Sequence, residues 1–148
     1  MFEVRVEAEF AAAHFLKDYH GKCENLHGHN YRVFAHAQGE NLDAGGMLID
    51  FGDLKAALRK VCKVLDHTNL NDLQENGAFV FMQNPSAERI AKYIYEKISL
   101  ELPDCPLYAV DVFETSTSRA RYIAPNCAGN ANSTSSMSEE NMDDSMWL

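Results

Sequence analysis

Three histidines near the N-terminus, His14, His27 and His29, have the spacing of a metal site. His27 and His29 stand two residues apart at the start of an alternating stretch, and residues two apart on a strand point to the same face. Gly28 between them lets backbone or a ligand approach closely. Three histidine ligands leave one position of a tetrahedral zinc ion free, which is the arrangement of a catalytic rather than a structural site.

Cys23, four residues before His27, allows two interpretations of that site. Beside a zinc ion and an imidazole its thiolate is favoured, so the sulfur can accept a proton at neutral pH. The same sulfur could instead be a fourth zinc ligand, which would close the site and make it structural. The spacing alone leaves both interpretations open.

Two further groups are candidates for acid–base chemistry or ligand binding. Asp66 and His67 are adjacent, and a carboxylate can fix the tautomer of an imidazole and increase its basicity; the alternative is a helix-end histidine at the helix dipole. Glu114 shares the strand phase of the apolar residues Val110 and Val112, where an unpaired carboxylate is costly. It could accept two parallel hydrogen bonds from a ligand with adjacent ring N–H and amino groups, or lie at an exposed strand end.

The segments that must position these residues are predicted to be four strands and two helices. Alternating apolar and polar residues predict strands over 2–10 (continued by three alanines to His14), 30–38, 108–115 and 119–123. Apolar residues at spacings of three and four predict two helices, the first capped by Asp50 and the second beginning near Ser86.

The predicted helices each carry one buried stripe. The stripes are Phe51, Leu54, Leu58, Val61 and Leu65 in the first helix, and Ile90, Ala91, Ile94 and Ile98 in the second. The resulting order, ββααββ, predicts an α+β fold in which an antiparallel four-stranded sheet carries both helices on one face.

The length of 148 residues fits one domain with a real core, which we place at residues 1–124. Residues 125–148 contain four acids and no lysine or arginine, and we expect them to form a disordered acidic tail. A formal net charge of -9 argues against nonspecific nucleic-acid binding and against docking on an anionic membrane.

The remaining histidines and cysteines have structural interpretations. His20 lies in an aperiodic stretch and should be exposed, whereas His36 shares a strand face with Arg32 and Phe34 and should be structural. The cysteines form no C-x-x-C pair and the N-terminus is not a signal peptide, so a reducing cytoplasm is expected. Of the cysteines outside the candidate site, one is predicted in a core, one in a loop and one in the tail: Cys62, Cys105 and Cys127.

A series of short motifs resembles the 6-pyruvoyltetrahydropterin synthase family over residues 1 to about 123. In chain order they are Phe10-Ala-Ala-Ala-His14, Cys23-Glu-Asn-Leu-His-Gly-His-Asn-Tyr31, Ile49-Asp-Phe51, Asp66-His-Thr-Asn-Leu-Asn71, Asn84-Pro-Ser86 and Glu114-Thr115. The resemblance implies a tunnelling fold (T-fold) whose subunits assemble into a barrel, a homo-oligomer with active sites at subunit interfaces.

The resemblance also implies a role for each candidate residue. Zinc would be held by His14, His27 and His29. Cys23 would accept a proton, Asp66 and His67 would form the relay that completes the acid–base system, and Glu114 would anchor the pterin ring and also belongs with the catalytic set. Substrate contacts are expected from four further residues, of which Thr115 follows the anchor and three are cations suited to a triphosphate: Lys17, Lys22 and Arg119.

The spacing Cys-x-x-x-His-Gly-His and the run Glu-Thr-Ser-Thr-Ser resemble the bacterial branch, 6-carboxytetrahydropterin synthase of the queuosine (7-deazapurine) pathway. The implied activity is a zinc-dependent lyase that converts 7,8-dihydroneopterin triphosphate to 6-carboxytetrahydropterin, acetaldehyde and triphosphate. Phe15 departs from the family pattern, which has a basic residue there. The alternatives are the 6-pyruvoyltetrahydropterin synthase reaction of tetrahydrobiopterin synthesis, and a non-catalytic module with a structural His₃Cys zinc site.

Overall fold

The main sheet has five strands in the order β3-β1-β2-β6-β7. Within residues 1–125, which the computed structural model describes, these strands are β1 (Phe2–His14), β2 (His27–Gly39), β3 (Thr68–Asn69), β6 (Leu107–Thr115) and β7 (Ser118–Ile123). Cys127 and nearly all of the predicted tail, residues 126–148, lie outside the described part of the chain.

The fold class is confirmed, and the main sheet has one strand more than the four predicted. The pairs β1–β2, β2–β6 and β6–β7 are antiparallel, whereas β3 pairs in parallel with Ala12 and Ala13 of β1. Two residues are too few to show a period of two, so this strand exists only through its pairing with β1. A separate short hairpin, formed by β4 (Gln74–Glu75) and β5 (Ala78–Phe79), was not predicted for the same reason.

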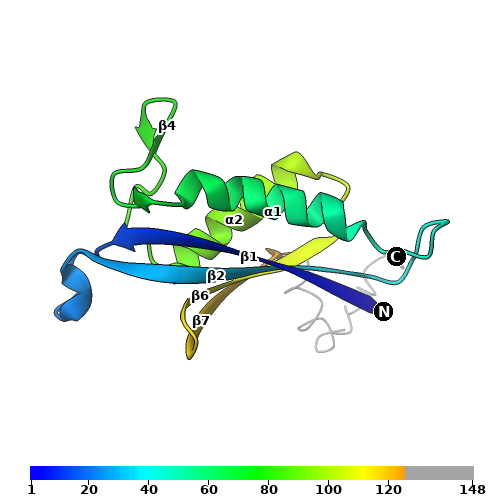
Figure 1. The fold of residues 1–148 in the computed structure, drawn as a ribbon, viewed down its shortest axis with the longest axis horizontal. Coiled ribbons are helices and arrows are strands. Elements are labelled where there is room, and N and C mark those ends of the chain that lie inside the picture. Colours follow the sequence, from blue (N-terminus) through cyan, green and yellow to red (C-terminus); the bar gives the residue numbers. More distant parts are fainter. Residues whose placement is uncertain (126–148) are drawn as a thin grey trace, which may run out of the picture.

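Both helices, α1 (Phe51–Leu65) and α2 (Ala87–Glu101), cover the same face of the sheet, as predicted (Figure 1). Each begins at a capping side chain: Asp50 accepts a hydrogen bond from the Gly52 N–H at 2.6 Å, and Ser86 accepts one from the Arg89 N–H at 3.3 Å. These caps satisfy N–H groups that have no partner inside the helix.

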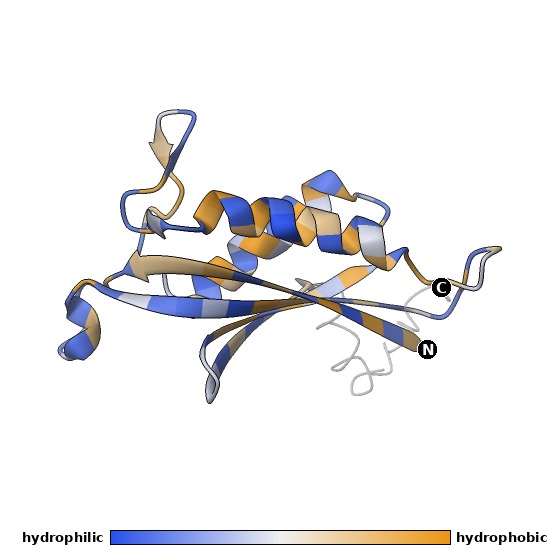
Figure 2. Ribbon diagram, viewed as in Figure 1, coloured by the Kyte–Doolittle hydropathy of each residue, from blue (hydrophilic) through white to orange (hydrophobic). Residues whose placement is uncertain are grey.

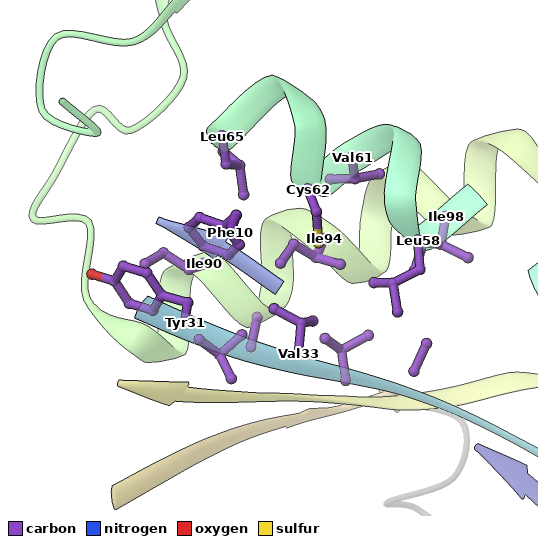
Figure 3. Close-up of a cluster of buried hydrophobic side chains, with 14 of the residues drawn as sticks. Phe10, Tyr31, Val33, Leu58, Val61, Cys62, Leu65, Ile90, Ile94 and Ile98 are labelled. Carbon is purple, nitrogen blue, oxygen red and sulfur yellow. The ribbon is translucent and has the colours of Figure 1, made fainter. Parts of the chain in front are cut away.

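The core lies between the helices and the sheet (Figure 3). The predicted stripe of α2 is completely buried, and so is that of α1 with the exception of Phe51, which is 57% exposed. Periodicity shows which side of a helix is apolar but not whether another element covers its first turn. Figure 2 shows the residue-by-residue alternation of hydropathy near the start of β1, which leaves one face of that strand for the core.

The face of the sheet opposite the helices carries a polar cluster around Asp111. This carboxylate accepts hydrogen bonds from Arg121 at 2.7 and 2.9 Å, and it lies 2.6 Å from Nε2 of His36. His36 and Asp111 are both buried, and the side-chain pairing confirms the structural interpretation of His36. The guanidinium of Arg121 and the hydrogen bond to His36 lower the pKa of Asp111 against the opposing effect of burial.

The remaining predictions about single residues agree with the structure. His20 is exposed, Cys62 is buried in the core, and Cys105 lies in the loop between α2 and β6. None of the helices within residues 1–125 has the length and apolar character needed to cross a membrane.

Candidate active site

The three predicted metal ligands meet at one end of the sheet. The register of β1 and β2 places His14 opposite His27, and His29 follows two residues later on the same face. One ligand nitrogen from each of the three lies within 4.8 Å of the other two. The antiparallel pairing therefore brings together residues that the sequence separates by 13 positions.

The hydrogen bonds of two of these rings fix their tautomers. Nδ1 of His14 lies 2.8 Å from the carbonyl oxygen of Pro85, and Nδ1 of His27 lies 2.7 Å from that of Asn25. A carbonyl only accepts, so each Nδ1 carries a proton and a neutral ring has its lone pair on Nε2. The two Nε2 atoms nevertheless face each other at 3.1 Å.

Two lone pairs at that distance repel each other unless a cation lies between them. Two nitrogens bound at about 2.1 Å to one tetrahedral ion are about 3.4 Å apart, close to the observed separation. Backbone carbonyls that hold the outer nitrogen of a histidine are a typical outer shell of metal sites. The three histidines therefore fit a metal ion.

Burial prepares the rings for this role. It lowers the pKa of His14 and of His29, mainly through desolvation, and the carboxylate of Glu114 opposes the effect in both. Nε2 of His29 is buried and has no hydrogen-bond partner within the described chain. The lowered pKa values favour neutral rings for His14 and His29, and neutral imidazole is the form that binds a metal.

Glu114 reaches the histidine cluster from β6. Its carboxylate oxygens lie 3.8 Å from Nε2 of His14 and 4.0 Å from Nε2 of His29. The side chain is 28% exposed, so one part of the carboxylate remains accessible. The strand phase deduced from the apolar residues of β6 therefore gave the correct face for Glu114.

Two asparagines hold the segment that follows His14. Asn71 binds both backbone groups of Phe15, accepting from its N–H at 2.9 Å and donating to its carbonyl at 3.0 Å. Asn84 does the same for Lys17, at 2.8 and 2.7 Å. Each asparagine mimics a neighbouring strand, and because Pro85 follows Asn84, one short loop both clamps this segment and orients His14.

Asp66 and His67 contact each other directly at the end of α1. Oδ2 of Asp66 lies 2.7 Å from Nδ1 of His67, and Oδ1 accepts a hydrogen bond from the Ala11 N–H at 2.8 Å. Both bonds lower the pKa of Asp66, and the bond from Ala11 has the larger effect. His67 has a left-handed backbone with φ of 56°, a costly conformation stabilised by its N–H bond to the Ala11 carbonyl.

The catalytic set predicted from the resemblance is not assembled within the described chain. His67 is 82% exposed and borders a groove that also touches His29, on the edge of the sheet near β3. Cys23 lies in the short 3₁₀ helix η1 (Lys22–Glu24), outside the cluster of ligand nitrogens, and no hydrogen bond joins its thiol to His67. The predicted roles of these residues remain predictions.

The predicted substrate contacts fall in different places. Lys17 lines a cavity of about 640 Å³ beside Phe15, with Arg89 on its rim, whereas Lys22 lies in η1. Arg119 lies on the face opposite the helices, 3.6 Å from Asp111, and Thr115 ends β6 one residue after Glu114.

Sequence reasoning missed the groups that orient the histidines. Asn84 and Pro85 stand out in the sequence only as part of a family motif, and the carbonyl of Asn25 carries no signal of residue type. Tyr31, fully buried next to the histidines, is also absent from the predicted site residues. Its position two residues after His29 on the same strand face was the signal that could have identified it.

Comparison with known proteins agrees with this geometry. A sequence profile described as 6-pyruvoyl tetrahydropterin synthase matches residues 3–125. The chain belongs to the 6-pyruvoyl tetrahydropterin synthase family. The recognition made from the motifs is therefore confirmed.

Individual members of the family show both branches among the relatives. A 6-carboxy-5,6,7,8-tetrahydropterin synthase of Synechocystis is 39% identical over 84% of this chain and 95% of its own length. The human 6-pyruvoyl tetrahydrobiopterin synthase is 35% identical over 76% of this chain and 85% of its own length. The solved structure of the Caenorhabditis elegans 6-pyruvoyl tetrahydropterin synthase superposes with a TM-score of 0.71 at 29% identity, covering 83% of this chain and 95% of that one.

Proposed function

We propose that this protein is a zinc-dependent 6-carboxy-5,6,7,8-tetrahydropterin synthase of queuosine-type biosynthesis. It would convert 7,8-dihydroneopterin triphosphate to 6-carboxytetrahydropterin, acetaldehyde and triphosphate. The main support for a bound metal ion is the pair of facing Nε2 atoms on His14 and His27, whose Nδ1 atoms are hydrogen-bonded to backbone carbonyls. The similarity to the Synechocystis protein and the spacing of Cys23 from His27 support the choice of branch.

Each candidate residue has a defined task in this reaction. Zinc, when bound by the three histidines, would polarise side-chain oxygens of the substrate so that neighbouring C–H protons become removable. Glu114 would anchor the pterin through two parallel hydrogen bonds from ring N–H and amino groups. Cys23 would accept a proton, and Asp66 would hold His67 in the tautomer that leaves its Nε2 free to exchange one.

Self-association would complete the site. His67 is largely exposed, no hydrogen bond joins it to Cys23 in the described chain, and both outer edges of the sheet carry unpaired backbone along most of β1 and along β7. Unpaired strand edges favour pairing with another chain. We propose a homo-oligomer in which Asp66 and His67 of one subunit serve the Cys23 of another, and in which Arg119 reaches a neighbouring site.

The triphosphate requires cations that the overall acidic chain supplies locally. Lys17 and Arg89 line the cavity next to Phe15, directly after the metal ligand His14. A small number of placed charges in a pocket of this volume is typical of a small-molecule site. We propose that Lys17 contacts the phosphates here, together with Lys22 from η1, and that the protein acts in the cytoplasm without nucleic-acid or membrane partners.

One sample tests the proposal. Purified protein is assayed for zinc per chain and then incubated with 7,8-dihydroneopterin triphosphate, with products identified by mass spectrometry. Near-stoichiometric zinc, a carboxypterin and acetaldehyde are expected. The human relative favours a second candidate, 6-pyruvoyltetrahydropterin synthase, and a pyruvoyl product without acetaldehyde would establish that reaction instead. Zinc without any product would contradict both.

A further inference from the structure

Within the part of the chain that the structure describes, the hydroxyl group of Tyr31 has no hydrogen-bond partner. The side chain is 0% exposed, and its oxygen makes no hydrogen bond within residues 1–125. Buried polar side-chain atoms are almost always paired, because an unpaired one has lost its water without gaining a protein partner. An unpaired hydroxyl that the fold nevertheless buries calls for a partner from outside these described residues.

The ring of Tyr31 is held rigidly. It stacks on Phe10 with centroids 4.6 Å apart and planes inclined by 12°. Figure 3 shows that the hydroxyl points away from the aliphatic cluster formed by residues such as Val33 and Ile94. Packing therefore fixes the direction of the O–H group, as a binding group requires.

The ring of Tyr31 also lies beside the histidine cluster. The ring centroid of Tyr31 lies 5.3 Å from that of His29 and 5.9 Å from that of His14, in edge-to-face arrangements. The negative charge of Glu114 also acts on Tyr31. The ring of Tyr31, the candidate metal ligands and the candidate pterin anchor thus lie close together.

We infer that the Tyr31 hydroxyl donates a hydrogen bond to an oxygen atom of the substrate's side chain at the histidine cluster. The inference rests on the proposed function, which assigns the N–H donors of the pterin ring to Glu114 and the side-chain oxygens to the neighbourhood of the histidines. A phenol can donate as well as accept, so it suits a hydroxyl or carbonyl oxygen, and the ring N–H groups are already assigned to Glu114. Tyr31 then selects pterins whose side chain carries oxygen near the ring.

Tyr31→Phe tests this, since it removes one oxygen and keeps the ring that stacks on Phe10. Affinities of the zinc-loaded protein are measured for neopterin, which has a hydroxylated side chain, and for pterin, which has none. Loss of one hydrogen bond should weaken neopterin binding about tenfold. Pterin binding should stay within about twofold, and kcat/KM for 7,8-dihydroneopterin triphosphate should fall by at least the same factor as neopterin affinity.

Tyr95→Phe is the matched control. Its hydroxyl lies 3.5 Å from the Leu107 carbonyl, and its ring packs on Tyr122, away from the histidines. This variant should alter neither affinity. In addition, Tyr31→Phe should bind zinc normally and, with zinc chelated, melt at the same temperature or higher than the wild type, because no bonded hydroxyl has been lost.

The outcomes separate the inference from the function on which it rests. Suppose that the wild type turns over the substrate, and that Tyr31→Phe loses equal affinity for neopterin and pterin or loses none. This result would overturn the inference and leave the proposed function intact. If the assembly formed by Tyr31→Phe differs in molecular mass from the wild-type assembly and neopterin binding is unchanged, the hydroxyl belongs to a subunit contact. This result would also overturn the inference. A wild type that shows the neopterin contrast without turnover would contradict the proposed reaction while supporting the hydrogen bond.

Discussion

Replacing Asn84 with alanine should weaken metal binding more than it weakens the fold. The change removes two hydrogen bonds to the backbone of Lys17, at 2.8 and 2.7 Å, in an exposed position. At about 0.5–1.5 kcal/mol each, they contribute about 1–3 kcal/mol, nearer the lower figure because water can replace them. The Asn84–Pro85 segment also orients His14, and loss of such outer contacts lowers metal affinity by about 10–100-fold.

The assay is a competition for zinc against a chromophoric chelator, run beside urea denaturation of the metal-free protein. Asp50→Ala is the matched control, since it removes the cap of α1 at a typical cost of about 1 kcal/mol. Asp50 lies before the first residue of α1, and Asp66 follows the last. Because the 15 residues of this helix span about 22 Å, Asp50 is far from the Asp66 end. If both variants lose stability and zinc affinity to the same extent, Asn84 has no special role in positioning His14.

Three further predictions concern the groups around the metal. With zinc chelated, the free energy of unfolding should fall as the pH drops below about 6.5. Burial lowers the pKa of His14 and His29 in the folded protein, so the unfolded chain binds more protons in this range. Urea titrations at pH 7.5 and 5.5 check this, and a stability that is unchanged or higher at pH 5.5 contradicts it. The variant Glu114→Gln should keep zinc but bind pterin about 10–100-fold more weakly, the usual effect of losing a charged hydrogen bond. Calorimetry measures the pterin affinity, and loss of zinc would make Glu114 a metal ligand instead. Cys23→Ala should keep zinc and the fold and abolish turnover, whereas loss of both zinc and fold would establish the structural His₃Cys site.

The strands and helices were predictable because their side chains repeat over many residues. The alternation in β1 runs over residues 2–10, long enough to define a face, and the stripe of α2 is complete. By contrast, β3 consists of Thr68 and Asn69 only, and it forms because the end of α1 returns the chain to the edge of β1. Such a strand has no local signal, since its cause is a contact between distant segments.

The histidine cluster was predictable for a different reason. His27 and His29 are chemically distinctive and lie on one strand, so spacing and residue type sufficed to propose that they converge. Backbone carbonyls orient two of the rings, and every residue has a carbonyl, so nothing in the sequence distinguished Pro85 or Asn25 from its neighbours. The structure was needed to see that His14 depends on a loop 71 positions away.

The contact between Asp66 and His67 shows how much a backbone conformation can add to a sequence pair. Neighbouring residues do not ordinarily hydrogen-bond through their side chains, and the sequence left this contact undecided. The left-handed φ of His67, held by the Ala11 carbonyl, turns the imidazole so that its Nδ1 lies 2.7 Å from Asp66, while the Ala11 N–H binds the other carboxylate oxygen. One residue of β1 thus fixes both members of the pair, and since β1 also carries His14, the candidate relay and the candidate metal site share a rigid strand although they do not touch within the described chain.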